Sequence, residues 1–247
     1  MSNNALELYH AGASTCSQRV RFVLAEKGIG YESRPIRLDL GEHLRPDYLG
    51  VNPNGLVPAI VHNGRAINDS SVINEYLNEV FPANSLIPED PYQRSQMRAW
   101  VQYLDEVMTP SIRYPSFQKF FGWHIRGLSD EQRQEYADRL PLRKHFALEI
   151  EGKDGFPDKA LNAAIDRIRS SLKRMEAALS SNLWLVGDKL TLADIAAMPS
   201  VVRLEDLGRT DLYADLPHVQ AWYKRLQEKP AFEAAYPPGS RLGDFAN

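Results

Sequence analysis

Cysteine is almost absent from the sequence: Cys16 is the only one among 247 residues. A single cysteine excludes an intramolecular disulfide framework and is typical of a reducing compartment. No stretch approaches the roughly 20 consecutive apolar residues of a membrane-spanning helix. The N-terminus also lacks the basic region followed by an apolar run that marks a signal peptide. We therefore expect a cytoplasmic protein that has no membrane partner.

An excess of charge of either sign is lacking as well. The 29 basic and 32 acidic side chains leave a formal net charge of −3. No global field would recruit nucleic acid or an anionic membrane, so we expect no nucleic-acid partner. Hydrophobic residues make up 43% of the chain, which is enough for a sizeable core.

The hydrophobic periodicity changes near Pro82. Before that point it predicts strands at residues 5–10 and 31–38, and a hairpin within 57–69 that turns at Asn63-Gly64. It predicts helices at residues 16–28 and 70–81. The first helix would bury Val20, Val23 and Leu24, and the second Val72, Ile73, Tyr76, Leu77 and Val80. Together these elements predict a compact α/β unit with a mixed sheet.

Strand signals almost vanish in the rest of the chain. After a segment rich in proline and polar residues, the 3.6-residue period predicts helices at residues 94–110, 129–152, 158–179, 191–207 and 217–236. The last but one begins with a capping box, in which Thr191 caps and Asp194 reaches back to it. Two arginines near the N-terminal motifs, Arg19 and Arg45, are expected to be solvated surface charges.

Four motifs support a family resemblance: STCSQRVRFVLAEKGIGYE (14–32), GEHLRPDYLGVNPNGLVPAIV (41–61), DSSVINEYL (69–77) and LTLADIAA (190–197). Together they resemble the cytosolic glutathione transferases, and the first resembles the serine-type signature of the zeta class. The resemblance implies an α/β plus all-α fold. Residues 1–82 would form a thioredoxin-like, glutathione-binding domain with a mixed four-stranded sheet, 83–90 a linker, and 91–247 an all-helical substrate-binding domain. It also implies a homodimer.

The resemblance further implies a set of glutathione contacts. Val57, before a cis Pro58, would pair its backbone with the cysteinyl part of glutathione. Ser70 would hold the α-carboxylate of the γ-glutamyl group, with Asp69 facing its amine, and His43 would contact the glycyl carboxylate. Each motif also has an ordinary explanation, such as a turn before an edge strand or a helix N-cap.

The catalytic group is sought among Ser14, Cys16 and Ser17. A thiol with a pKa near ~8.5 is only slightly ionised at neutral pH. One charge-assisted hydrogen bond, helped by a helix N-terminus, can supply the ~2 kcal/mol needed to lower that pKa usefully. On alignment with the family motif Ser14 is the predicted donor, although Ser14 or Thr15 could simply cap the helix. Cys16, as a thiol at a helix N-terminus, and Ser17, as in some β-etherases, remain alternatives.

The electrophile is expected in a cleft lined by aromatic side chains from the RYPSFQKFFGWH region, namely Tyr114, Phe117, Phe121 and Trp123. The long connection around 128–157 weakly resembles bacterial β-etherases, which cleave aryl ethers. The predicted function is therefore attack of glutathione on a hydrophobic, aromatic electrophile, in detoxification or aromatic catabolism, with glutathione as co-substrate and no metal. One alternative is a maleylacetoacetate-type isomerase, whose substrate is a dicarboxylate; the aromatic region shows no evident cationic clamp for such a substrate. The other alternative is a binding protein without turnover.

Overall fold

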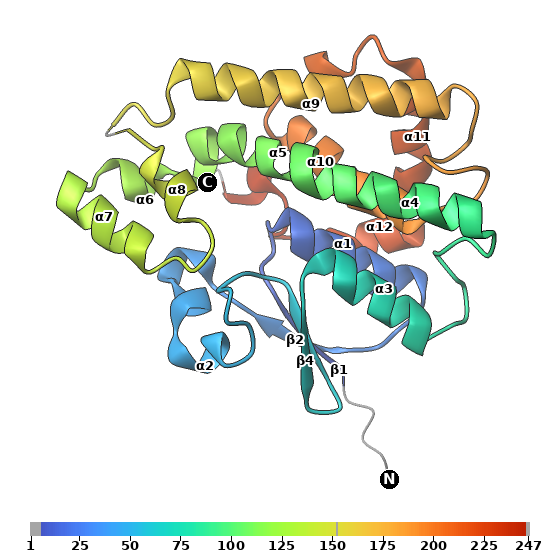
Figure 1. Ribbon diagram of the computed structural model, residues 1–247, viewed down its shortest axis with the longest axis horizontal. Coiled ribbons are helices and arrows are strands. Elements are labelled where there is room, and N and C mark those ends of the chain that lie inside the picture. Colours follow the sequence, from blue (N-terminus) through green and yellow to red (C-terminus); the bar gives the residue numbers. More distant parts are fainter. Residues whose placement is uncertain (1–5, 152, 246–247) are drawn as a thin grey trace.

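The computed structural model describes residues 6–151 and 153–245, apart from the side chains of residues 123, 124, 243 and 245. Residues 5 and 152, at the ends of two elements expected from the sequence, lie outside the described residues. Figure 1 shows a small sheet with two helices packed on one face and a larger group of helices beyond them. No helix in the described ranges is long and apolar enough to cross a membrane.

The sheet has four strands in the order β2-β1-β3-β4. They are β1 (Leu6–His10), β2 (Glu32–Pro35), β3 (Ala59–His62) and β4 (Arg65–Asn68). Strand β1 runs parallel to β2 and antiparallel to β3, and β3 runs antiparallel to β4. The turn between β3 and β4 consists of Asn63 and Gly64, both with positive φ (52° and 74°), which is the two-residue hairpin that the sequence predicts. The mixed four-stranded sheet is thus confirmed.

Two helices of the first unit, α1 (Thr15–Glu26) and α3 (Ser70–Val80), pack against each other and cover the sheet. Helix α1 buries Val20, Val23 and Leu24, as predicted, but it also buries Arg19 and Arg21. The reason is visible in Figure 1: α1 lies between the sheet and the C-terminal helices α10 and α12, so both of its sides are covered. The hydrophobic pattern of α1 predicts only the apolar face that packs on the sheet, so it cannot reveal that other helices pack on the opposite face.

The rest of the described chain is helical. A run with two π-helical segments (Leu104–Met108 and Phe117–Phe121) contains α4 (Pro91–Tyr103), α5 (Thr109–Ser116) and α6 (Trp123–Arg126). The later helices are α7 (Asp130–Asp138), α8 (Lys144–Leu148), α9 (Asp158–Leu179), α10 (Leu192–Asp206), α11 (Pro217–Gln227) and α12 (Pro230–Ala235). Short helical turns occur at α2 (Pro46–Leu49) and, as 3₁₀ turns, at Leu38–Leu40, Glu42–Leu44, Thr210–Leu212 and Leu242–Phe245.

Two helices expected as single elements are divided at prolines. The stretch 129–152 forms α7 and α8 on either side of Pro141, and the stretch 217–236 forms α11 and α12, with Pro230 at the start of α12. Proline lacks an N–H donor and clashes with the preceding turn, so it ends a helix or begins a new one.

The apolar face expected on α3 is narrower than predicted. Ile73 and Leu77 are fully buried, whereas Val72 and Val80 are 55% and 42% exposed, so their expected burial is wrong. The sheet has only four strands, so a single row of side chains along α3 is enough to cover the part of the sheet that lies under this helix.

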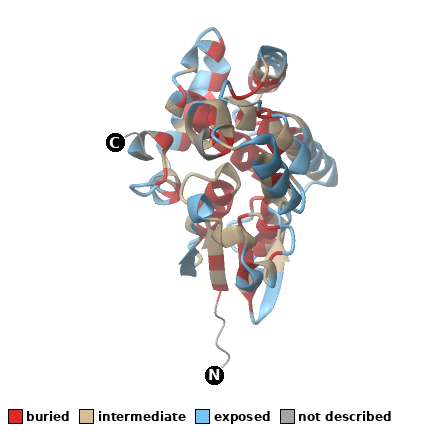
Figure 2. Cartoon of the chain, turned by 90° about the vertical axis from the view of Figure 1, so that its left-hand side faces the viewer, coloured by how far each residue is buried: buried red, intermediate tan, exposed pale blue. Residues whose placement is uncertain are grey.

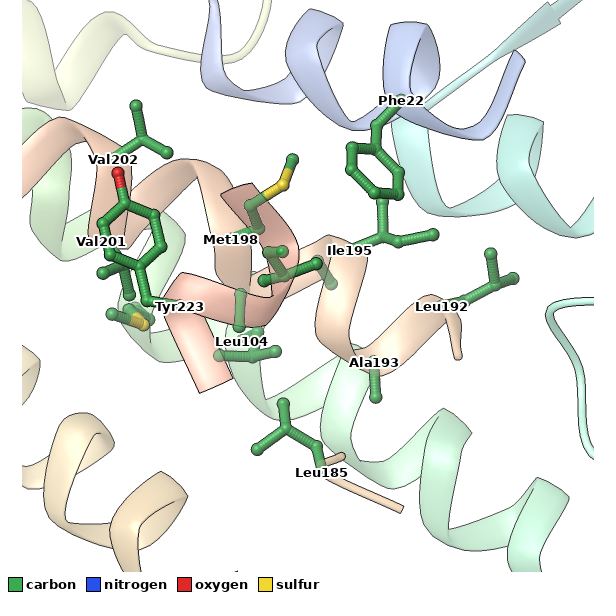
Figure 3. Close-up of a cluster of buried hydrophobic side chains, with 14 of the residues drawn as sticks. Phe22, Leu104, Leu185, Leu192, Ala193, Ile195, Met198, Val201, Val202 and Tyr223 are labelled. Atoms are coloured by element: carbon green, nitrogen blue, oxygen red, sulfur yellow. The ribbon is translucent and has the colours of Figure 1, made fainter. Parts of the chain in front are cut away.

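One hydrophobic core joins the two parts of the chain. It contains Leu8 and Phe22 from the first unit together with Ile195 and Met198 from α10. Figure 3 shows Phe22 of α1 above Ile195, with Met198 beside it. Buried residues lie in the interior of both parts in Figure 2, and exposed ones lie on the periphery. The N-terminal end of α1 is therefore held against the helical part by continuous packing.

Candidate active site

Ser14 caps the N-terminus of α1. Its φ and ψ are −73° and 118°, and its Oγ accepts a hydrogen bond from the Ser17 N–H at 3.2 Å. A hydroxyl that accepts this bond still carries its own hydrogen and can donate it to an anion. The capping role and the donor role, which the sequence presents as alternatives, are therefore compatible in this geometry.

The loop before Ser14 is fixed by two arginines. Arg21 donates to the carbonyl oxygens of Ala11 at 3.2 Å and Gly12 at 2.8 Å, and Arg203 of α10 donates to the carbonyl oxygen of Ala13. No described residue accepts a hydrogen bond from the N–H groups of Thr15 and Cys16. Free N–H groups in the first turn of a helix attract negative charge, so this end of α1 suits a thiolate.

The two alternative residues differ in their surroundings. Cys16 is a free, half-buried thiol in the first turn of α1. Ser17 is fully buried, and its Oγ accepts a hydrogen bond from the Ala11 N–H at 3.3 Å. The Ser17 hydroxyl therefore lies in the interior.

The loop that leads to Val57 is held by side chains behind it. Tyr48 Oη and Asn52 Nδ2 each donate to the Leu56 carbonyl oxygen at 2.6 Å. The Val57–Pro58 peptide bond is cis, as the resemblance implied. Within the described ranges the Val57 N–H and C=O have no hydrogen-bond partner, so both groups can pair with another backbone.

Asp69 is the N-cap of α3. Its Oδ1 accepts hydrogen bonds from the N–H groups of Ser71 at 2.9 Å and Val72 at 3.3 Å. Its φ of 73° is unusual for a residue other than glycine, and such backbone strain occurs preferentially at functional sites. The adjacent Ser70 is buried, with 4% of its surface exposed. Because one carboxylate oxygen of Asp69 already caps the helix, the second oxygen is the one that could face an amine.

His43 is half-buried in the 3₁₀ turn Glu42–Leu44. The neighbouring loop is covered by the helical part of the chain: a Cβ placed on Gly55 would lie 3.4 Å from both the His43 carbonyl oxygen and Pro141 Cδ. The connection between α7 and α8 therefore borders the region expected to hold the glycyl end of glutathione.

A buried polar network next to the site is not visible in the sequence. Arg19 donates to Asp105 Oδ1 at 2.5 Å and to Thr109 Oγ1 at 2.6 Å, and Ser71 donates to Asp105 Oδ2 at 2.6 Å. The expectation of a solvated Arg19 is wrong, because its side chain is only 2% exposed. Asp105 lies in the π-helical segment after α4, and π-turns are frequent at functional sites. Arg45, by contrast, is exposed as expected and ion-pairs with Glu42 at 3.4 Å.

The aromatic residues expected to line the substrate cleft pack largely on one another. The ring centroids of Tyr114 and Phe117 lie 5.2 Å and 5.0 Å from that of Phe146, and Tyr114 Oη donates to Glu149 at 2.6 Å. Phe121 lies beneath the Arg203 guanidinium, 5.5 Å from it. The Trp123 side chain lies outside the described part of the chain. Tyr114, Phe117 and Phe121 are half-buried, so each can expose an edge to a ligand.

Arginines from separate segments lie near the start of α1: Arg203 of α10 donates to the Ala13 carbonyl oxygen, Arg19 of α1 donates to Thr109 of α5, and Arg113 and Arg143 neighbour the packed rings of Tyr114 and Phe146. Burial lowers the pKa of Arg113, and it lowers that of Arg143 to about 10, with repulsion from Arg113 as a further cause. Burial also lowers the pKa of Arg203 to about 10. For Arg19 the effect of burial is outweighed by the charge of Asp105, which raises its pKa. The chain folds these four cations together from segments far apart in sequence.

No group of three or more His, Cys, Asp or Glu side chains is placed to hold a metal ion in the part of the chain that the structure describes. The chemistry offered by these residues is that of hydroxyl and N–H donors and guanidinium cations near the start of α1.

Comparison with known proteins identifies the family. Models described as "Glutathione S-transferase, N-terminal domain" and "Glutathione S-transferase, C-terminal domain" match residues 13–80 and 137–230. Glutathione S-transferase 1 of Dianthus caryophyllus is 31% identical over 80% of this chain and 76% of its own length. The chain belongs to the glutathione S-transferase family, a family of enzymes, and the fold class expected from the sequence is confirmed.

Two bacterial relatives are similar over nearly their whole length. Protein LigF of Sphingobium sp. strain SYK-6 is 29% identical over 96% of this chain and 95% of its own. The crystal structure of that protein, described as a beta-etherase, matches with a TM-score of 0.84 and 28% identity over 96% of this chain and 99% of LigF. The maleylacetoacetate isomerase of Pseudomonas aeruginosa is 28% identical over 94% of this chain and 96% of its own.

Proposed function

We propose that this protein is a glutathione transferase in which the Ser14 hydroxyl stabilises the glutathione thiolate for attack on an aromatic electrophile. The observation that carries the proposal is the position of Ser14 at the N-terminus of α1, where its Oγ accepts from Ser17 and keeps its hydrogen for donation. The thiolate is the nucleophile, and Ser14 forms no covalent bond. Cys16 is a neighbour of the reacting sulfur, and the burial of Ser17 argues against Ser17.

The electrophile is held beside that sulfur by the helical part of the chain. The thiolate sulfur bonds to an electrophilic carbon, and the leaving group departs with the electrons of the broken bond. In ether cleavage that leaving group is an aryloxide. The similarity to LigF over both chains supports an aryl ether as the substrate class. The half-buried Tyr114, Phe117 and Phe121 provide apolar edges for such a ring.

Glutathione itself is proposed to lie along the first unit, residues 1–82. Val57 offers the unpaired backbone N–H and C=O beside Pro58, while Ser70 and Asp69 stand at the start of α3 and His43 stands near the glycyl end. A homodimer in the cytoplasm remains part of the proposal. The exposed Val72, Val80 and Tyr92 supply apolar surface for a second subunit.

A second candidate is a glutathione-dependent isomerase that acts on a dicarboxylate. The specific observation in its favour is the group of arginines near the start of α1, together with the similarity to a maleylacetoacetate isomerase. A protein that binds glutathione without turnover is the third candidate. The intact arrangement of Ser14, Val57 and Ser70 argues against that one.

The experiment is glutathione-dependent turnover of three substrates, an aryl-ether model, an aryl halide and maleylacetone, by the wild type and the variants Ser14→Ala, Cys16→Ala and Ser17→Ala. We expect Ser14→Ala to lose at least about tenfold in kcat/KM at neutral pH and to recover part of it at higher pH, where glutathione ionises unaided. Full activity of Ser14→Ala would reject Ser14 as the donor. Absence of glutathione binding by calorimetry would reject the whole proposal.

A further inference from the structure

Arg113 and Arg143 differ from the other arginines in the described part of the chain. Both are half-buried, yet neither forms a hydrogen bond or an ion pair with any described residue. Every other described arginine that is not exposed has a partner: Asp105 for Arg19, backbone carbonyls for Arg21 and, for Arg241, the carboxylates of Glu205 and Asp206. A guanidinium that is withdrawn from water without a partner is costly, so two of them in one place require a reason.

The two side chains reach the same place from separate segments. Arg113 comes from α5, and Arg143 comes from the turn between α7 and α8, two residues after the Pro141 that borders Gly55. Arg19, one turn after Cys16 in α1, donates to Thr109 Oγ1 at 2.6 Å, and Thr109 lies one turn before Arg113 in α5. The ring of Tyr114, next to Arg113, lies 5.2 Å from that of Phe146, one turn after Arg143. Both arginines therefore lie near the start of α1, on the side of the helical part.

We infer that Arg113 and Arg143 form a carboxylate-binding pair that selects an electrophile carrying an organic carboxylate beside its reactive carbon. Planar guanidinium groups match carboxylate oxygens in geometry, and a bound carboxylate would remove the repulsion between the two cations. This inference deepens the proposed function and rests on it, because it assumes that glutathione reacts at this site.

A carboxylate of glutathione is the other source of the same chemistry. Its glycyl end is expected at His43 in the first unit, near the connection that carries Arg143, whereas Arg113 belongs to α5, one turn after the Thr109 that bonds Arg19. A carboxylate bound by both arginines must lie within reach of Arg113 on the helical side. We therefore assign the pair to the electrophile. A selective rise in the KM for glutathione would contradict this assignment.

Two electrophiles that differ only in the carboxylate provide the test: 1-chloro-2,4-dinitrobenzene and 2-chloro-3,5-dinitrobenzoate. In both, the thiolate sulfur bonds to the ring carbon and chloride leaves with the electrons of the carbon–chlorine bond. The quantity measured is the ratio of kcat/KM for the carboxylate probe to that for the neutral probe, with each value compared with the uncatalysed rate. We expect the wild type to favour the carboxylate probe, and Arg113→Met and Arg143→Met each to lower the ratio by about tenfold.

Arg139→Met is the matched control, because Arg139 is exposed at the end of α7 and has no described partner. It should leave the ratio unchanged, and Arg113→Lys should restore part of what Arg113→Met loses. Equal losses on both probes, or a rise in the KM for glutathione alone, would overturn the inference.

A binding measurement separates this inference from the proposed function. The glutathione-loaded wild type should bind 3,5-dinitrobenzoate, which has no leaving group, more tightly than 1,3-dinitrobenzene, and Arg143→Met should abolish the difference. If the wild type turns over neither probe but still binds 3,5-dinitrobenzoate more tightly, the result contradicts the proposed function and supports the carboxylate-binding pair. If the wild type turns over the neutral probe but shows no such binding preference, the result contradicts the carboxylate-binding pair and is consistent with the proposed function.

Discussion

Arg19 and Asp105 form an ion pair across the boundary between the two parts of the chain. Arg19 belongs to α1, and Asp105 belongs to the π-helical segment after α4. Ser71 at the start of α3 also donates to Asp105, so one carboxylate joins three elements around the site. The Arg19 side chain is 2% exposed and that of Asp105 is 34% exposed, so removing the carboxylate leaves a buried cation with neither water nor a counter-ion.

Asp105→Ala should therefore lower the free energy of unfolding by about 3 kcal/mol, since it leaves Arg19 buried and unpaired. The matched control is Glu75→Ala, which removes the partner of Arg98 in a more exposed pair and should cost less than about 1 kcal/mol. Urea unfolding followed by circular dichroism measures both. Equal and small losses would show that the Arg19 charge is not sequestered.

His10 is a half-buried titratable group near the loop that carries Ser14. Its Nδ1 lies 3.2 Å from Arg21 Nη1, which can only donate, and its Nε2 lies 2.8 Å from Ser33 Oγ. Nδ1 must therefore accept, and the neutral ring is favoured. Burial, followed by the charge of Arg21, lowers the pKa of His10 from 6.5 to about 4.

This lowered pKa predicts the direction of acid destabilisation. The unfolded chain takes up a proton on His10 below about pH 6.5, whereas the folded chain does so only near pH 4. The contribution of His10 to stability is therefore intact above pH 6.5. It is lost as the pH falls from 6.5 to about 4. We expect about 2 kcal/mol of unfolding free energy to be lost in this way, after allowing for the partial exposure of the ring. His10→Gln should show a correspondingly smaller loss between neutral pH and about pH 4 in urea titrations. His145→Gln, at an exposed position, should keep the wild-type slope.

At the scale of elements, two helices begin with capping boxes in very different surroundings. In α10, Asp194 is fully buried, and its carboxylate accepts from the N–H groups of Thr191 and Leu185 and from Trp222 Nε1, at 2.9, 2.8 and 2.9 Å. In α7, the box formed by Ser129 and Gln132 is exposed. The capping box of α10 therefore links three segments through hydrogen bonds, whereas the capping box of α7 stabilises only its own helix.

Asp194→Ala should cost at least about 3 kcal/mol of unfolding free energy, because three buried N–H groups lose their acceptor. Ser129→Ala should cost about 1 kcal/mol, which is typical of an exposed N-cap. Thermal or urea unfolding of the two variants measures the contrast. Similar losses for both would mean that the Asp194 carboxylate serves only as a helix cap.

At the scale of the whole molecule, the C-terminal segment packs against the loop that carries Ser14. Gln18 Nε2 donates to the Ser240 carbonyl oxygen at 3.1 Å, and Arg21 Nε donates to that of Ala235 at 2.8 Å. A Cβ on Gly12 would lie 2.8 Å from the Gly239 carbonyl oxygen. Gly12 is therefore required by this close approach of two backbones at opposite ends of the chain.

Gly12→Ala should displace the segment around Gly239 and lower the unfolding free energy by about 1–3 kcal/mol, as overpacking does. It should also reduce turnover, because Ser14 lies two residues further along the same loop. Gly30→Ala is the control, since a Cβ there meets nothing within 4 Å, and it should change stability by less than about 0.5 kcal/mol. Wild-type stability and turnover in Gly12→Ala would mean that the two segments do not press on each other.

Several parts of the fold could be predicted because they depend on neighbours in sequence. The Asn63-Gly64 turn, the capping box at Thr191 and the long helix α9 follow from local backbone preferences and from periodicity. The helix breaks at Pro141 and Pro230 also had a local signal, which is the proline itself. The prediction followed the hydrophobic periodicity instead and treated each stretch as one helix. The position of Ser14 at the start of α1 followed from the same local information, and its catalytic role stays a prediction.

The sequence by itself determined the order of the elements, the mixed sheet and the membership of the glutathione S-transferase family, because these follow from local backbone preference, hydrophobic period and four continuous motifs. The tertiary structure alone decided the surroundings of the candidate site. Arg19 is buried and Val72 is exposed because α10 and α12 cover α1 while no described element covers that side of α3. Likewise, Arg113 and Arg143 lie in segments that pack on each other through Tyr114 and Phe146 near the start of α1, although they are separated from Cys16 by about a hundred residues or more in sequence. Charge and burial depend on which segments fold against one another, and no periodic pattern within a single segment carries that information.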